Sequence, residues 1–186
     1  DKHNLKQALA NHVARAAEKL RSQDSLCGEI CVFINTNRFR KKDLQYNNSV
    51  ILPFDDLTDN TNTIMKKAFK VLDRLYRPNY NYKKIGVILL DLKQRKKDVK
   101  NNDYVIQDNL FTYDKNYKNI ADASDICMEI LDDINTKMGK MTLFYGSQGI
   151  VKHSGRKKIE KDKWRMRSFH RSPFYTTNWA DILKVS

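Results

Sequence analysis

The sequence predicts a domain that mixes helices and strands, followed by a polar linker and a smaller C-terminal segment. Within residues 1–92 the hydrophobic pattern gives the order helix, strand, strand, helix, strand. The apolar periodicity is lost from residue 93 to about residue 119 and then returns as a helical repeat. A chain of 186 residues is also long enough to bury a core without metal or disulfide crosslinks.

The first predicted helix covers residues 5–20, where apolar residues recur at intervals of three and four. Asn4 and Gln7 fit the spacing of a capping box at its start. Two strands follow at residues 29–37 and 49–54, because both runs are rich in β-branched and aromatic residues. The connection between them is expected to be exposed, since it carries four basic residues: Arg38, Arg40, Lys41 and Lys42.

The second predicted helix covers residues 59–76, with Asp59 as its N-cap and Arg77-Pro78 ending it. Residues 85–92 follow as a continuous apolar strand. The next segment is dominated by Lys, Asn and Asp, so it buries too little apolar surface to offset the entropy of ordering it. We therefore expect a linker there.

Beyond the linker, apolar residues repeat every four positions from Ile126 to Met138, and Gly139 stands where a helix commonly ends. Residues 141–146 predict a short strand. Residues 147–173 hold nine Lys or Arg against two acidic residues, so more than half of the net charge lies there.

The net charge of +13 at pH 7 is typical of a protein whose partner carries phosphates, although it also serves solubility. A mean hydropathy of -0.70 and the lack of a long apolar run exclude a membrane-spanning protein. The N-terminal residues do not resemble a secretory signal. Cys27, Cys31 and Cys127 lack metal-binding spacing, so we expect reduced thiols and a cytoplasmic location.

Five strings of the sequence resemble one family in the same order. They are QALANHVARAAEKLRSQ, KKIGVILLDL, QDNLF, TLFYGSQGI and SPFYTTNWADILKV. They are similar to the C-terminal part of Y-family translesion DNA polymerases, of the type of the UmuC catalytic subunit of DNA polymerase V. The resemblance covers nearly the whole chain.

The resemblance implies three parts. Residues 1–92 would form an α+β little finger domain, an antiparallel sheet backed by two helices, here lacking its first strand. Residues 93–120 would be a flexible basic linker with a clamp-binding peptide, and residues 121–186 a small α/β C-terminal extension. Little finger domains of this family lay their sheet along duplex DNA and do no chemistry.

The same resemblance implies the partners and the cofactor. The partners would be primer-template DNA, the bacterial sliding clamp and, by family, a UmuD′ dimer and RecA. The carboxylates that bind Mg²⁺ for polymerisation would lie upstream of Asp1. We therefore expect no cofactor in this chain, although its parent family is a DNA-directed DNA polymerase.

The predicted clamp-binding peptide is Gln107, Asp108, Asn109, Leu110 and Phe111. Its Gln amide offers hydrogen bonds, and its Leu and Phe fit an apolar pocket. Ordering the linker offsets part of the gain from burying Leu110 and Phe111, so we expect a weak affinity on the order of μM. Asp108 replaces a Leu that is common in such peptides, which should weaken binding further. The alternative is a chance match in which Leu110 and Phe111 dock on the nearer domain.

Two basic surfaces are candidates for DNA contacts. Candidates for duplex phosphates are Arg38, Arg40, Lys41, Lys42, Asn48, Ser49, Lys83 and Lys84. The alternative is a solvated basic loop without a ligand. The second surface mixes cations with an aromatic ring, as proteins that bind single strands do, and comprises Lys163, Trp164, Arg165, Arg167 and Arg171. Its aromatic residues could equally form a small core, or the surface could contact UmuD′.

No catalytic motif is present in the sequence. Asp55, Asp56 and Asp59 cluster, but acids before a helix are better explained as caps and partners of the helix dipole. Two other function classes remain open. One is a stand-alone regulatory protein that binds DNA and the clamp, and the other is a small metal-dependent nuclease that uses Asp55 and Asp59.

Overall fold

The computed structural model describes residues 1–95 and 115–149. Up to β3 the helices and strands follow in the predicted order, and they confirm the α+β class. The elements are α1 (Lys2–Ser22), β1 (Ser25–Thr36), β2 (Asn47–Thr58), α2 (Thr61–Leu75), β3 (Tyr82–Gln94), α3 (Lys115–Lys137) and the 3-10 helix η1 (Gly146–Gln148).

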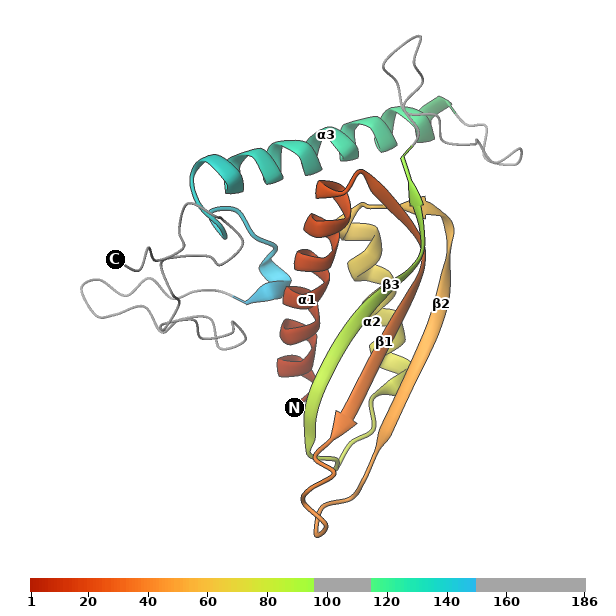
Figure 1. Cartoon of the computed structure of the whole chain (residues 1–186), viewed down its shortest axis with the longest axis vertical. Coiled ribbons are helices and arrows are strands. Elements are labelled where there is room, and N and C mark those ends of the chain that lie inside the picture. Colours follow the sequence, from red (N-terminus) through yellow and green to blue (C-terminus); the bar gives the residue numbers. More distant parts are fainter. Residues whose placement is uncertain (96–114, 150–186) are drawn as a thin grey trace, which may run out of the picture. The chain divides into compact units, whose positions relative to one another are not determined.

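The three strands form one antiparallel sheet in the order β2-β1-β3. Helices α1 and α2 pack against each other and cover one face of this sheet, as Figure 1 shows. The apolar stripes predicted for both helices supply most of the core. Its fully buried larger side chains include Leu9, Val13, Ile30, Val32, Ile34, Ile64, Val71, Leu72 and Leu75.

Both predicted helix caps are wrong by a few residues. Helix α1 begins at Lys2, and the carboxylate of Asp1, not Asn4, accepts a hydrogen bond from a first-turn amide. The N-cap of α2 is Asn60, whose side-chain oxygen accepts hydrogen bonds from two backbone amides of the first turn. Asp59 is unavailable for capping because its carboxylate is bonded to Arg95.

Strand β2 does not end at the acidic residues Asp55 and Asp56 but continues to Thr58. Its pairing with β1 extends the strand beyond the apolar run, so that Cys27 lies opposite Thr58 after a bulge. Pro53 is tolerated inside the strand because β2 has a hydrogen-bonded neighbour on one side only within the described sheet.

Helix α3 begins at Lys115, earlier than the apolar repeat alone indicates. No Gly or Pro interrupts Lys115–Lys137, so the helix can extend once formed. The predicted strand at residues 141–146 is wrong, because these residues form turns and lead into η1. Instead of pairing with a strand, Leu143 exchanges two hydrogen bonds with the side chain of Asn135, at 2.9 and 3.0 Å.

A partly buried charge cluster connects α3 to α1 and to the start of α2. The guanidinium of Arg21, whose side chain is 11% exposed, lies 2.5 and 2.9 Å from the two carboxylate oxygens of Asp132. It also donates to the carbonyl of Asp59 and the hydroxyl of Thr61, each at 2.9 Å. Burial disfavours its charge, but the carboxylates of Asp132 and Asp59 outweigh this and raise the pKa of Arg21.

The three cysteines are free, as expected. Cys27 and Cys31 are buried in β1, and Cys127 is exposed on α3. Burial, together with the charge of Asp59, raises the pKa of the Cys27 thiol to about 12, so this thiol stays protonated and unreactive at neutral pH.

None of the helices in the described residues is long and apolar enough to span a bilayer.

Candidate nucleic-acid interface

The basic connection between β1 and β2 is an exposed loop of residues 37–46 at one end of the sheet, here called the basic loop. Its four cationic side chains are exposed, as predicted. They are Arg38, Arg40, Lys41 and Lys42. None of the four forms an ion pair within the described residues.

The basic loop is held in shape by the amide of Gln45. Its side-chain nitrogen lies within 3.3 Å of three backbone carbonyls of the loop, those of Asn37, Arg40 and Asp43. Two backbone hydrogen bonds, from Arg40 to Asn37 and from Asp43 to Arg40, close successive turns. The cations are therefore presented on a braced loop, which reduces the entropy lost when a ligand orders them.

Four tyrosines anchor the base of this loop to the end of α2. The rings of Tyr46, Tyr76, Tyr80 and Tyr82 contact one another with centroids 5.2 to 6.2 Å apart. The hydroxyl of Tyr46 donates to the carbonyl of Leu75 at 2.9 Å. This cluster was not predicted, although the string YRPNYNY at residues 76–82 signals it in the sequence.

Lys83 and Lys84 lie at the start of β3, next to the basic loop. The ammonium of Lys83 is 3.5 Å from the side-chain oxygen of Asn37, so the structure brings this predicted cation to the loop. Lys84 lies opposite Asn35 in the register of β1 and β3. Asn35 alternates with buried core residues along β1, so it lies on the face of the sheet turned away from α1 and α2, here called the outer face. Lys84, directly opposite Asn35, lies on the same face.

The structure separates the two predicted polar residues of β2. Ser49 lies opposite Phe33 and belongs to the outer face. Asn48 lies opposite the buried Ile34, and its amide donates to the hydroxyl of Tyr46 at 3.2 Å. Asn48 therefore supports the tyrosine cluster, and only Ser49 is placed to face a ligand on the outer face.

The centre of the outer face is apolar. In register, Cys31 lies between Ile51 on β2 and Ile88 on β3. The side chains of Ile51 and Ile88 are 54% and 48% exposed. No helix of the described residues covers them, because α1 and α2 lie on the opposite face.

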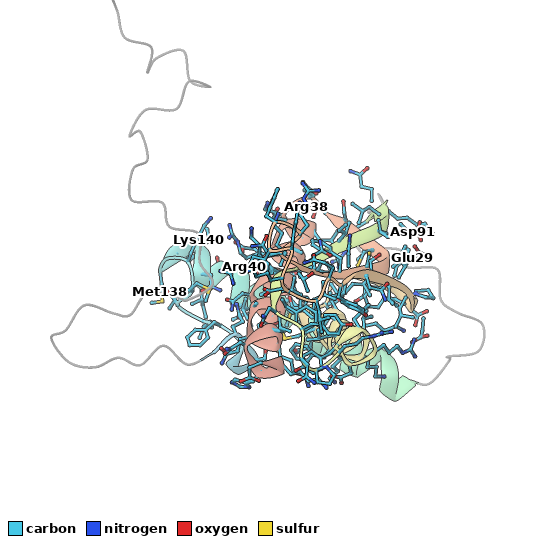
Figure 2. The ribbon with its side chains drawn as sticks, turned by 90° about the horizontal axis from the view of Figure 1, so that it is seen from below. Glu29, Arg38, Arg40, Asp91, Met138 and Lys140 are labelled. Carbon is cyan, nitrogen blue, oxygen red and sulfur yellow. The ribbon has the colours of Figure 1, made fainter. Side chains whose placement is uncertain are left out.

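The end of the outer face remote from the basic loop carries the acidic residues Glu29 and Asp91. Glu29 pairs with Leu90, whereas Asn35, farther along β1, pairs with Lys84 at the loop end. In Figure 2, which looks along the sheet from the loop end, Glu29 and Asp91 are labelled to one side of Arg38 and Arg40. The carboxylate of Asp91 lies against Gly28, next to Glu29 on β1. The carboxylate of Asp91 is paired with the ammonium of Lys93 at 3.4 Å, so the charge of this end is largely offset, and the cations of the basic loop favour phosphates at the loop end.

The acidic residues Asp55, Asp56 and Asp59 do not gather into a ligand group. The side chain of Asp59 is 8% exposed and accepts a hydrogen bond of 2.6 Å from Arg95. Burial raises the pKa of Asp59, although the nearby arginines act in the opposite direction. In the part of the chain that the structure describes, no three His, Cys, Asp or Glu residues lie close enough to hold a metal ion.

Comparison with known proteins identifies the family. Residues 1–103 match the C-terminal domain of the impB/mucB/samB family. The chain belongs to this family. Residues 127–185 match a second conserved domain, DUF4113, described as a domain of unknown function.

Curated relatives agree with this assignment. Protein UmuC of Salmonella typhimurium strain LT2 is 34% identical over 185 residues, which cover 100% of this chain and 39% of UmuC. MucB and SamB of Salmonella typhimurium are 32% and 31% identical over 96% of this chain and 37% of their own lengths. The chain is therefore a UmuC-type C-terminal part and spans about two fifths of the length of these relatives.

Two predicted sites of this family member lie outside the described residues. One is the clamp-binding peptide at residues 107–111, and the other is the C-terminal basic surface around Trp164. The basic loop, with Lys83, Lys84 and Ser49, is thus the candidate interface whose geometry the structure gives.

Proposed function

We propose that this chain is the DNA-holding and clamp-tethering part of an error-prone translesion DNA polymerase that acts in DNA repair and SOS mutagenesis in the cytoplasm. The observation that carries the proposal is the braced, exposed basic loop at one end of the outer face, found in a member of the impB/mucB/samB family.

The basic loop would bind DNA through phosphates. Guanidinium and ammonium groups on the loop meet phosphate oxygens, and Lys84 and Ser49 extend the contact onto the outer face. Contacts of this kind fix position and orientation without reading sequence. The excess positive charge lies at the loop end, because Asp91 at the other end is paired with Lys93, so the duplex would be held at the loop end of the sheet.

The salt dependence of binding to primer-template DNA tests this proposal. If the four loop cations, Lys83 and Lys84 each neutralised one phosphate, the plot of log K against log salt would have a slope of about -5. Replacing Arg38, Arg40, Lys41 and Lys42 together by Ala should weaken binding and make the slope shallower by about three to four. Fluorescence anisotropy over a salt series measures both quantities.

A control variant removes four cations from the helical side of the domain. Lys19, Lys66, Lys70 and Arg74 are exposed on α1 and α2, away from the outer face. Their joint replacement by Ala changes the net charge equally and should leave the slope close to that of the wild type. Equal effects of the two variants, or a flat salt response of the wild type, would contradict a specific DNA-holding surface.

Clamp tethering rests on the peptide at residues 107–111. Residues Leu110 and Phe111 would enter an apolar pocket of the sliding clamp, and the linkage would raise the local concentration of the polymerase on its template. The double variant Leu110→Ala, Phe111→Ala should abolish capture of the chain by immobilised clamp. Asp108→Leu, which restores the common residue, should bind more tightly than the wild type.

The UmuD′ dimer and RecA are proposed as further partners because the relatives are UmuC-type proteins. In this proposal the chain contributes affinity and position, and the polymerisation chemistry belongs to other sequence. Nucleotide incorporation by the purified chain alone would contradict it, and so would a chain that binds neither DNA nor clamp.

A further inference from the structure

The basic loop displays one aromatic side chain that the proposed phosphate contacts do not use. Phe39 is 77% exposed, the highest exposed fraction among the large hydrophobic residues that the structure describes. The Arg38 guanidinium and the Lys83 ammonium lie 5.2 and 5.8 Å from the centre of its ring. An isolated exposed Phe needs no explanation, but one with two cations close to its largely exposed ring has the composition of a nucleotide-binding platform.

The position of Phe39 is fixed by the loop. Its backbone amide donates to the side-chain oxygen of Asn37 at 3.2 Å, and the same oxygen lies 3.5 Å from the ammonium of Lys83. The ring also borders an open hollow of about 460 Å³. The other residues that line this hollow are Arg40, Lys41, Lys42 and Asp43.

These features suit a base together with its phosphates. A base that stacks on the ring of Phe39 would have three cations of the same hollow within reach of its adjoining phosphates. The carboxylate of Asp43 could accept a hydrogen bond from a base amino group. Stacking requires a base with a free face, and in a duplex the neighbouring base pairs cover these faces.

We propose that Phe39 is a stacking platform for an unpaired base of single-stranded DNA, such as the template overhang beyond a primer. This inference rests on the proposed DNA-holding function and adds to it a preference for a single-stranded ligand at the loop. The cations near Phe39 supply affinity for phosphates, and the ring supplies contact with the base.

Binding of a short oligothymidylate to the full chain at fixed salt tests the proposal. Phe39→Ala should weaken this binding by roughly fivefold to a hundredfold, the range that loss of one stacked base gives. Phe39→Trp should bind at least as tightly as the wild type. Its added tryptophan fluorescence should be quenched by the oligonucleotide, measured as the difference from the wild type, which already has two Trp residues.

Three controls separate stacking from charge, from general loss of apolar surface and from loss of folding. An abasic oligomer of the same length keeps the phosphates but lacks bases, so wild type and Phe39→Ala should bind it equally. Leu44→Ala removes another exposed apolar side chain of the same loop and should leave oligothymidylate binding unchanged. Circular dichroism of Phe39→Ala checks that the variant is folded.

The outcomes distinguish failure of the stacking platform from failure of the proposed DNA-holding function. If the wild type binds duplex and single-stranded DNA but Phe39→Ala binds oligothymidylate as the wild type does, the stacking platform is wrong and the DNA-holding surface stands. If Phe39→Ala weakens blunt duplex binding equally, the ring inserts into a groove, which also overturns the inference. If the wild type binds no DNA, the proposed function itself fails.

Discussion

Gly86 shows how a single missing side chain shapes the outer face. The ring of Phe33 lies directly over its backbone, and a Cβ at this position would be 2.3 Å from the ring. The ring lies on the outer face of the central strand, so a Cβ at residue 86 would force it to rotate toward solvent and give up its contact with the backbone of β3. Glycine is therefore required here for close approach, not for an unusual backbone angle.

We predict that Gly86→Ala destabilises the domain by about 1 to 3 kcal/mol, the usual cost of an overpacked contact. The midpoint of urea unfolding, followed by circular dichroism, measures the change. Gly146→Ala is the matched control, because nothing lies within 4 Å of a Cβ built there. Equal stability of the two variants would show that Phe33 moves aside without cost.

At the level of elements, α3 shows that an apolar repeat does not decide which side of a helix is buried. Ile126 and Ile130 belong to the repeat but are exposed, whereas Met128 is buried and its sulfur is 3.2 Å from the hydroxyl of Tyr145. Asp132 lies one turn after Met128 and on the same side of the helix. Its bond to Arg21 sets the rotation of α3.

We predict that Asp132→Ala loosens α3 and lowers the free energy of unfolding by about 2 to 4 kcal/mol, because it leaves the buried Arg21 without its main counter-ion. Hydrogen exchange of the α3 amides should rise more than that of α2. Asp133→Ala is the control, since the Asp133–Lys137 ion pair is exposed and should contribute less than about 1 kcal/mol. Similar exchange in both variants would contradict the role given to Arg21.

For the whole molecule, a net charge of +13 opposes self-association that its sheet would otherwise favour. Strands β2 and β3 form the edges of the described sheet, and the apolar centre of the outer face is exposed. Free strand edges and apolar surface are common causes of association. The positive charge keeps molecules apart only while salt does not screen it.

We therefore predict that in high salt the apparent mass of the chain rises with protein concentration. In low salt the apparent mass should stay at the value of the monomer. Static light scattering over a concentration series at two ionic strengths measures this. A strict monomer at high salt would show that the edges and the outer face do not associate.

Much of the fold could be predicted from the sequence because its signals are local. The apolar stripes of α1 and α2, the exposed basic loop and the turn after Leu75 all follow from residue spacing and turn chemistry. The candidate interface was predicted in part. Charge alone pointed to the loop cations, but charge does not indicate on which face of β2 Asn48 and Ser49 lie, since this depends on register.

The sequence by itself determined the order of the elements, the faces that helices α1 and α2 bury, and the position of the basic loop, because these depend on neighbours a few residues apart. Tertiary structure alone decided the partner of Asp59, the rotation of α3, the length of β2 and the closeness of Lys83 to the ring of Phe39. Most of these depend on contacts between residues far apart in the chain, such as Arg21 and Asp132. Spacing along the sequence carries no information about which of many possible distant partners a charged or aromatic side chain meets.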